Sequence, residues 1–193
     1  MVVPTLIWPA LRAALAFMPL VYILVERRVR RRPWSDLGVR ARGFGKALAG
    51  NWYLVVIAIA SQPITIFAAR TWNSTWFDHM LSRLPVPEAG GVALLLALMP
   101  VVVFIEELTY RGFFQQRISW SVGSPAGIAV VAVAFGLMHL HRGVTTVVAL
   151  DIGLIAVDGV IYGMMFARGK NIFVPWLAHF VGNLVGIAYL LSL

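Results

Sequence analysis

Two adjacent glutamates stand in an otherwise apolar part of this sequence, where charged side chains are rare. Glu106 and Glu107 follow the apolar run 90–105, whose sixteen residues are a few short of the length that a helix needs to cross a bilayer. The helix must therefore carry both carboxylates to the edge of the membrane or into it. Since ionisable groups at that depth are costly, an acidic pair there indicates a functional site.

Helical spacing gives the two glutamates different neighbours. Residues three and four apart share a helix face, so Glu107 can meet Tyr110 and Arg111, whereas Glu106 points about a quarter-turn away. Arg111 can neutralise Glu107, which leaves Glu106 for another role. The structural alternative is that Glu107 and Arg111 form only an i,i+4 pair at the water interface.

Three polar side chains in later apolar stretches could join Glu106 in one site: His139, His179 and Asn183. Glu106 lies seventeen residues before the turn at 123–124 and His139 fifteen after it, roughly 26 and 22 Å along two antiparallel helices. A carboxylate and an imidazole at one height are what activation of a water molecule requires. His179 and Asn183 share a face one helical turn apart. Taken alone, each histidine or amide is more often an interhelical hydrogen bond.

The elements that carry these residues are membrane helices by composition. Hydrophobic residues make up 60% of the chain, charged residues 12%, and the mean hydropathy is +0.84. A soluble domain is nearer half apolar and a quarter charged. We therefore predict an all-α, polytopic transmembrane bundle that forms one membrane-embedded domain over residues 1–193. The chain has no cysteine, so disulfides, thiolate chemistry and Cys-ligated zinc are excluded.

Hydropathy predicts about six spans, a polar loop at 70–88 and an interfacial segment. The interfacial segment is the basic amphipathic stretch 34–48. The predicted spans are 4–25, 52–69, 90–120, 126–140, 146–166 and 173–191.

The net charge of +8 indicates a lipid bilayer as partner rather than nucleic acid, because the basic residues flank apolar runs. If the amino terminus faces outward, the inner loops hold twelve Lys and Arg residues and the outer loops hold three. This bias predicts that both termini face outward.

Three motifs of this sequence resemble those of the CPBP (CAAX protease and bacteriocin-processing, or Abi) family of intramembrane proteases, which includes the type II CAAX prenyl endopeptidases. Residues 106–111 (EELTYR) resemble its EExxxR motif, 135–139 (FGLMH) its FxxxH motif and 179–183 (HFVGN) its HxxxN motif. All three occur in the family's order on separate predicted helices, and the resemblance covers about 90–193, the expected catalytic core.

The resemblance implies hydrolysis of a peptide bond within the membrane. Glu106 and His139 would together activate the attacking water. His179 and Asn183 would polarise the scissile carbonyl and stabilise its oxyanion. The neighbouring pair of Glu107 with Arg111 would hold the helix and tune the catalytic carboxylate.

A metal-dependent mechanism is the rival expectation. It makes His139, His179 and either Glu106 or Glu107 ligands to a divalent metal such as zinc, with the second glutamate as base. Two histidines and a carboxylate are enough for a catalytic zinc, although the chain has no HExxH spacing. The cofactor is open at this point.

The expected substrate is a membrane-anchored protein or peptide: a prenylated CAAX protein, a bacteriocin precursor or the carboxy-terminal sorting tail of a surface protein. The compact chain suggests a bacterial or archaeal cell membrane. An alternative function is a non-catalytic immunity or partner-stabilising protein on the same scaffold. Another is a proton-coupled carrier with a relay of acids, against which stands the lack of an internal repeat.

Asp151 and Asp158 share a face of the fifth predicted helix and belong to no motif of the family. They line a cavity that receives a cationic substrate residue, or they make buried structural contacts, for instance to Arg111 or Arg142. The structural interpretation is the one we favour slightly.

Overall fold

The computed structural model of the chain describes residues 3–83 and 91–193, apart from the side chains of 3–16, 83, 91 and 92. All regular structure in these ranges is helical, and four of the helices are long and apolar enough to cross a membrane. The predicted all-α membrane bundle is therefore confirmed. The four candidate spans are Phe44–Trp72, Ala93–Val122, Thr145–Gly169 and Phe173–Leu191.

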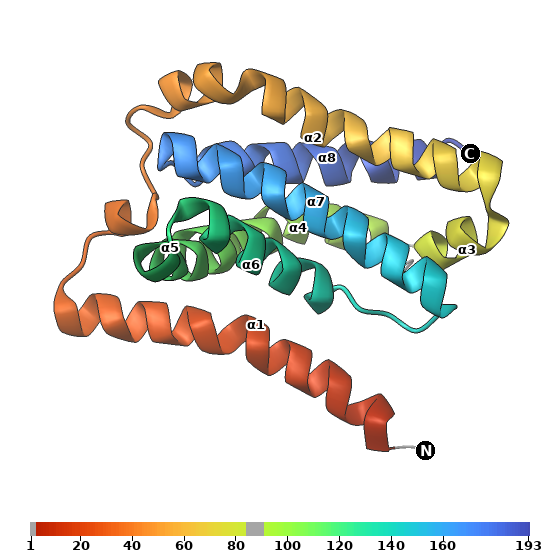
Figure 1. Cartoon of the computed structure of the whole chain (residues 1–193), viewed down its shortest axis with the longest axis horizontal. Coiled ribbons are helices and arrows are strands. Elements are labelled where there is room, and N and C mark those ends of the chain that lie inside the picture. The colour runs from red at the N-terminus through yellow and green to blue at the C-terminus, as the bar shows by residue number, and fades with distance from the viewer. Residues whose placement is uncertain (1–2, 84–90) are drawn as a thin grey trace.

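The chain contains ten helical elements within the described ranges (Figure 1). In chain order they are α1 (Val3–Arg30), the 3₁₀ turn η1 (Trp34–Leu37), α2 (Phe44–Trp72), α3 (Ser74–Arg83), α4 (Gly91–Glu107), the π-helical segment η2 (Leu108–Gln115), α5 (Gln116–Val122), α6 (Ser124–Met138), α7 (Thr145–Gly169) and α8 (Phe173–Leu191).

The predicted interfacial segment 34–48 forms no continuous helix, and its place at the membrane interface stays a prediction. Only the turn η1 forms at its start, and α2 already begins at Phe44. Gly38 and Gly43 both have φ above +80°. Since this left-handed region suits glycine and ends a helix, the two positions explain why the stretch is broken.

The stretch 70–88 is also not a simple loop as far as the structure describes it. α2 continues to Trp72, and α3 follows at once over Ser74–Arg83. The side chain of Asn73 accepts a hydrogen bond of 3.0 Å from the backbone N–H of Trp76, which caps the new helix. Trp76 is 8% exposed and packs in a cluster with Ala69, so this tryptophan is a core residue of the bundle.

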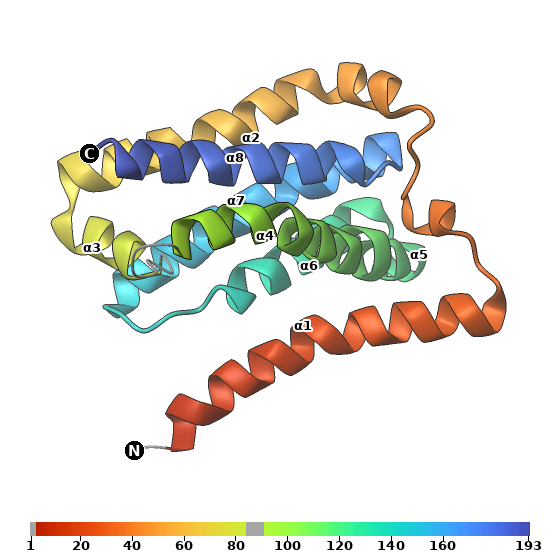
Figure 2. The same ribbon diagram turned by 180° about the vertical axis from the view of Figure 1, so that it is seen from behind.

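The bundle is built around two close helix pairs, α2 with α8 and α6 with α7. A buried apolar cluster that includes Leu54, Met165 and Val174 joins α2, α7 and α8. Figures 1 and 2 show α2, α7 and α8 side by side, with α6 between them and α1. The start of α1 and the end of α8 lie at one end of the molecule, and η1 and α5 lie at the other.

Candidate active site

The acidic pair stands where the candidate span Ala93–Val122 changes from α to π geometry. Glu106 and Glu107 are the last residues of α4, and η2 follows directly. Most of η2 is buried, and a Cβ atom added to its Gly112 would lie 2.8 Å from the carbonyl oxygen of Leu37. Segments of π-helix are frequent at functional sites. The sequence analysis expected an uninterrupted helix, because an apolar pattern does not distinguish one wide turn.

Glu107 and Arg111 form the ion pair that their spacing suggests, and both side chains are fully buried. Arg111 Nη1 lies 3.2 Å from Glu107 Oε1. Its Nη2 donates a hydrogen bond of 3.2 Å to the carbonyl oxygen of Gly159 in α7, and the guanidinium lies 4.5 Å from the ring centre of Phe135 in α6. The pair therefore ties the acidic segment to both neighbouring helices.

His179 of α8 lies between the two glutamates. Its Nδ1 is 2.9 Å from Glu107 Oε1, and its Nε2 is 3.9 Å from Glu106 Oε2. A carboxylate accepts, so Nδ1–H is the donor to Glu107 and Nε2 is the nitrogen that faces Glu106. The imidazole stacks on the ring of Tyr162, with 4.8 Å between ring centres. This bond to Glu107 was not predicted from the sequence, because spacing along one helix cannot set the rotation of another.

His139 lies just beyond the end of α6, not inside a helix that continues to 140 as predicted. Its backbone N–H caps the helix, and its Nδ1 is 2.8 Å from the carbonyl oxygen of Phe135. Because a carbonyl only accepts, the proton is on Nδ1 and Nε2 is the basic nitrogen of the neutral ring. The Phe135 ring contacts the imidazoles of both His139 and His179.

One cavity of about 620 Å³ connects the predicted site residues. Its polar wall includes Glu106, His139, His179 and Asn183. The rest of the wall is mainly aliphatic and comes from α2, α4, α7 and α8, with Met80 of α3 and Phe135 of α6. A carboxylate, two imidazoles and an amide thus face one apolar chamber, an arrangement that can activate water and stabilise a developing oxyanion.

The two aspartates of α7 make buried contacts. Asp158 lines the cavity and accepts hydrogen bonds from Ser61 Oγ at 3.1 Å and Gln62 Nε2 at 2.9 Å, both on α2. Asp151 Oδ2 lies 3.6 Å from His79 Nε2 of α3, with both side chains buried. The sequence did not identify these three partners, since they lie on other elements far along the chain.

The arrangement of the His, Asp and Glu side chains is relevant to the hypothesis of a metal-dependent mechanism. Among the described residues, no group of three or more His, Asp or Glu side chains is arranged to hold a metal ion. His139, His179 and a glutamate are therefore not gathered into a three-ligand site in this arrangement. Dependence on zinc stays a prediction, and the mechanism proposed below uses side chains alone.

Comparison with known proteins gives one match. A family model described as "Type II CAAX prenyl endopeptidase Rce1-like" matches residues 88–185, just over half of the chain. The matched range includes the predicted site residues Glu106, Glu107, His139, His179 and Asn183. No curated protein and no solved structure matches the chain.

Proposed function

This chain belongs to the Rce1-like family of type II CAAX prenyl endopeptidases, and on that premise we propose that it hydrolyses a peptide bond of a membrane-associated protein or peptide through Glu106, His139, His179 and Asn183. The observation that carries the proposal is the single cavity that these four side chains line together.

Glu106 and His139 activate the attacking water in this mechanism. The side chain of Glu106 is 31% exposed, whereas that of Glu107 is fully buried and already bound to Arg111 and His179. His139 offers Nε2 as a base, since its Nδ1 donates to a backbone carbonyl. The water gives one proton to the Glu106 carboxylate while His139 Nε2 accepts a hydrogen bond from it, and the water oxygen attacks the scissile carbonyl carbon.

His179 and Asn183 stabilise the tetrahedral oxyanion by donating from Nε2–H and the side-chain amide. For Nε2 to donate while Nδ1–H binds Glu107, the ring is an imidazolium, and the two glutamates together balance its charge and that of Arg111. The carbon–nitrogen bond then breaks, and the proton taken from water passes to the leaving amine. The ion pair of Glu107 with Arg111 holds His179 in place rather than touching substrate.

The shape of the cavity suits a substrate held by an apolar anchor. Its walls between the polar end and the far end of α8 are aliphatic, with Leu94, Leu98 and Ile187 among the lining residues. An extended apolar chamber next to a few convergent polar groups is the usual form of a small-molecule or lipid site. We infer that the anchor occupies this chamber while the peptide bond lies at the polar end.

The test is cleavage of a farnesylated CAAX peptide by the purified chain in liposomes. Glu106→Gln and His139→Ala should each lower the rate about 100- to 10,000-fold, the range of general acid–base catalysis. Asp78→Asn is the matched control, because it makes the same carboxylate-to-amide change at an exposed position. Cleavage by both active-site variants at the wild-type rate would rule the mechanism out. If both variants keep the function of the protein in cells, the non-catalytic alternative would be favoured.

Substrate identity and metal dependence need separate measurements. Comparing the termini of membrane proteins in cells with the wild type and with Glu106→Gln should reveal new carboxy-terminal or amino-terminal ends only in the wild type. Elemental analysis of the purified chain, with a chelator titration of its activity, tests zinc. Stoichiometric zinc together with inhibition that added zinc reverses would establish the metal mechanism instead.

A further inference from the structure

A second cavity, of about 470 Å³, lies at the end of the molecule opposite the start of α1 and takes no part in the proposed cleavage. It is formed by the end of α1, by η1 with the chain that follows it, and by α5. Its charged lining residues are Arg27, Arg32, Arg40, Arg117, Glu26 and Asp36. Positive charges therefore exceed negative ones in this pocket, which we term the arginine pocket.

Two of its four arginines are already paired. Glu26 is mostly buried and forms an ion pair with Arg117 and longer ones with Arg30, at 3.6 Å, and Arg32, at 3.9 Å. Arg27 and Arg40 have no ion-pair partner in the part of the chain that the structure describes. Asp36 lines the same pocket but is exposed to solvent, where screening weakens its effect. The pocket thus keeps a net positive charge, and Arg27 and Arg40 are its two guanidinium groups that Glu26 does not engage.

Both guanidinium groups are held in place. Arg27 stacks on the ring of Trp34 at 3.6 Å from the ring centre. Arg40 donates a hydrogen bond of 2.9 Å from Nε to the carbonyl oxygen of Ser35. Arginine held in this way loses little freedom on binding, and its planar fork matches the oxygens of a phosphate group.

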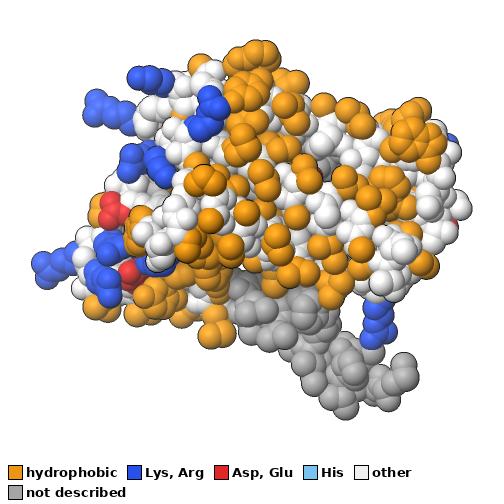
Figure 3. Space-filling view, in the orientation of Figure 1, with side chains coloured by type: hydrophobic (Ala, Val, Ile, Leu, Met, Phe, Trp, Pro, Cys, Tyr) orange, Lys and Arg blue, Asp and Glu red, His pale blue; other side chains and the backbone are white. Residues whose placement is uncertain are grey.

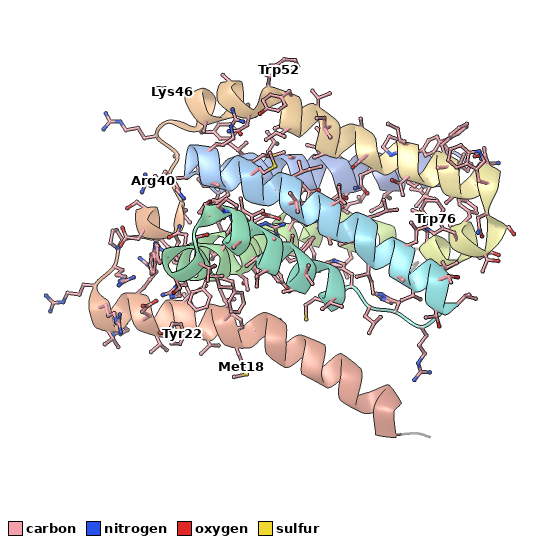
Figure 4. The ribbon with its side chains drawn as sticks, in the orientation of Figure 1. Met18, Tyr22, Arg40, Lys46, Trp52 and Trp76 are labelled. Atoms are coloured by element: carbon pink, nitrogen blue, oxygen red, sulfur yellow. The ribbon has the colours of Figure 1, made fainter. Side chains whose placement is uncertain are left out.

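The arginine pocket lies where a lipid headgroup would be found. Trp34 and Trp120 beside it are 37% and 67% exposed, as is typical of aromatic residues at a membrane interface. Figure 3 shows Lys and Arg gathered at this end of the molecule, next to a broad apolar surface, and Figure 4 labels Arg40 and Lys46 there. Basic pockets beside membrane helices on the cytoplasmic side bind anionic headgroups.

We propose that the arginine pocket binds the phosphate group of an anionic phospholipid through Arg27 and Arg40. The bound headgroup would join α1 to η1 and α5, and so fasten a helix that otherwise meets the bundle mainly through η2. A free phosphate ion offers the same chemistry, so the test separates the two sources.

The experiment follows thermal unfolding of the purified full chain in a non-ionic detergent with added phosphatidylglycerol or phosphatidylcholine. The wild type should gain stability with phosphatidylglycerol, in a saturable way, and not with phosphatidylcholine. Arg27→Gln with Arg40→Gln should weaken the apparent affinity about 25-fold, or about fivefold for each arginine. Arg28→Gln with Arg42→Gln is the matched control: it removes two exposed arginines from the same end, outside the pocket.

Equal weakening in both double variants would overturn the site, because it would show general attraction to basic surface. Inorganic phosphate that reproduces the wild-type shift would keep the pocket but assign it to a free anion. If the Arg27 change prevents folding, Arg40→Gln alone is measured by native mass spectrometry, which counts bound phosphatidylglycerol. Retention of lipid at wild-type affinity by Arg40→Gln would also contradict the proposal.

Discussion

Glu106 and Glu107 are neighbours in the chain, but their carboxylates have different surroundings. Glu107 is fully buried and binds both Arg111 and His179. Glu106 is partly exposed and lines the cavity. A carboxylate that takes a proton from water needs contact with that water, whereas one that positions an imidazole must be held. The burial of each side chain therefore supports the division of roles that we propose.

Substituting each glutamate by glutamine should separate these roles. Glu107→Gln keeps the shape but leaves Arg111 buried without a counter-charge, so it should destabilise the protein by about 3–5 kcal/mol as well as impair cleavage. Glu106→Gln should lower the cleavage rate about 100- to 10,000-fold and leave the unfolding midpoint close to that of the wild type. Unfolding in detergent and cleavage in liposomes are measured on both variants. Equal stability of the two would contradict the assigned roles.

At the residue scale, the sequence predicted contacts within one helix better than contacts between helices. Four-residue spacing was enough to suggest the ion pair of Glu107 with Arg111, since helix geometry alone places them together. The bond from His179 to Glu107 depends on how α8 is rotated against α4, and the bonds from Ser61 and Gln62 to Asp158 depend on α2. Such rotations follow from packing of the whole bundle, which one sequence does not show.

At the element scale, close approach of two helices places His139, the histidine for which we propose a catalytic role. A Cβ atom added to Gly136 of α6 would lie 2.7 Å from the carbonyl oxygen of Ile152 in α7. The two helices can therefore touch only because this residue has no side chain. His139 follows three residues later, so the same contact fixes where its imidazole enters the cavity.

Replacing this glycine should disturb both stability and activity. Gly136→Ala forces α6 away from α7, which we expect to cost about 1–3 kcal/mol, and it should lower the rate of cleavage by displacing His139. Gly153→Ala is the matched control, because an added Cβ there has nothing within 4 Å. That change should be neutral or stabilise by up to about 1 kcal/mol through helix propensity. Comparable losses in both variants, by unfolding and by cleavage rate, would argue against a packing role for Gly136.

The predicted helices agree best with the structure where apolar residues run unbroken, and agree least where polar residues form a helix. Long apolar runs predicted α7 and α8, because a helix satisfies all backbone hydrogen bonds within one segment in lipid. The short helix α3 was missed, since its polar composition suggested a loop and its cap at Asn73 is only one local signal. The π-helical segment η2 was not predicted, because an apolar pattern in the sequence does not distinguish a π-helical turn from an α-helical one.

At the scale of the whole molecule, charge and chain ends are segregated. Lys and Arg gather at the end that holds η1 and α5, while α1 starts and α8 ends at the opposite end (Figures 1 and 3). This segregation agrees with an orientation in which the basic end faces the cytoplasm. In that orientation the arginine pocket would lie against the leaflet that carries most anionic lipid.

Single cysteines provide a direct test of this orientation, because the chain has none of its own. Lys46 lies near the start of α2, at the basic end of the molecule, and Arg142 follows the carboxyl end of α6. Both residues are exposed. With a membrane-impermeant maleimide on intact cells, Arg142→Cys should be labelled and Lys46→Cys should react only after permeabilisation. Labelling in denaturant controls for thiol reactivity. The reverse labelling pattern would mean that the arginine pocket faces the outer leaflet, where anionic headgroups are scarce. Its location would then no longer support binding of an anionic phospholipid. The proposed chemistry of the cavity that holds Glu106 and His139 would not be affected.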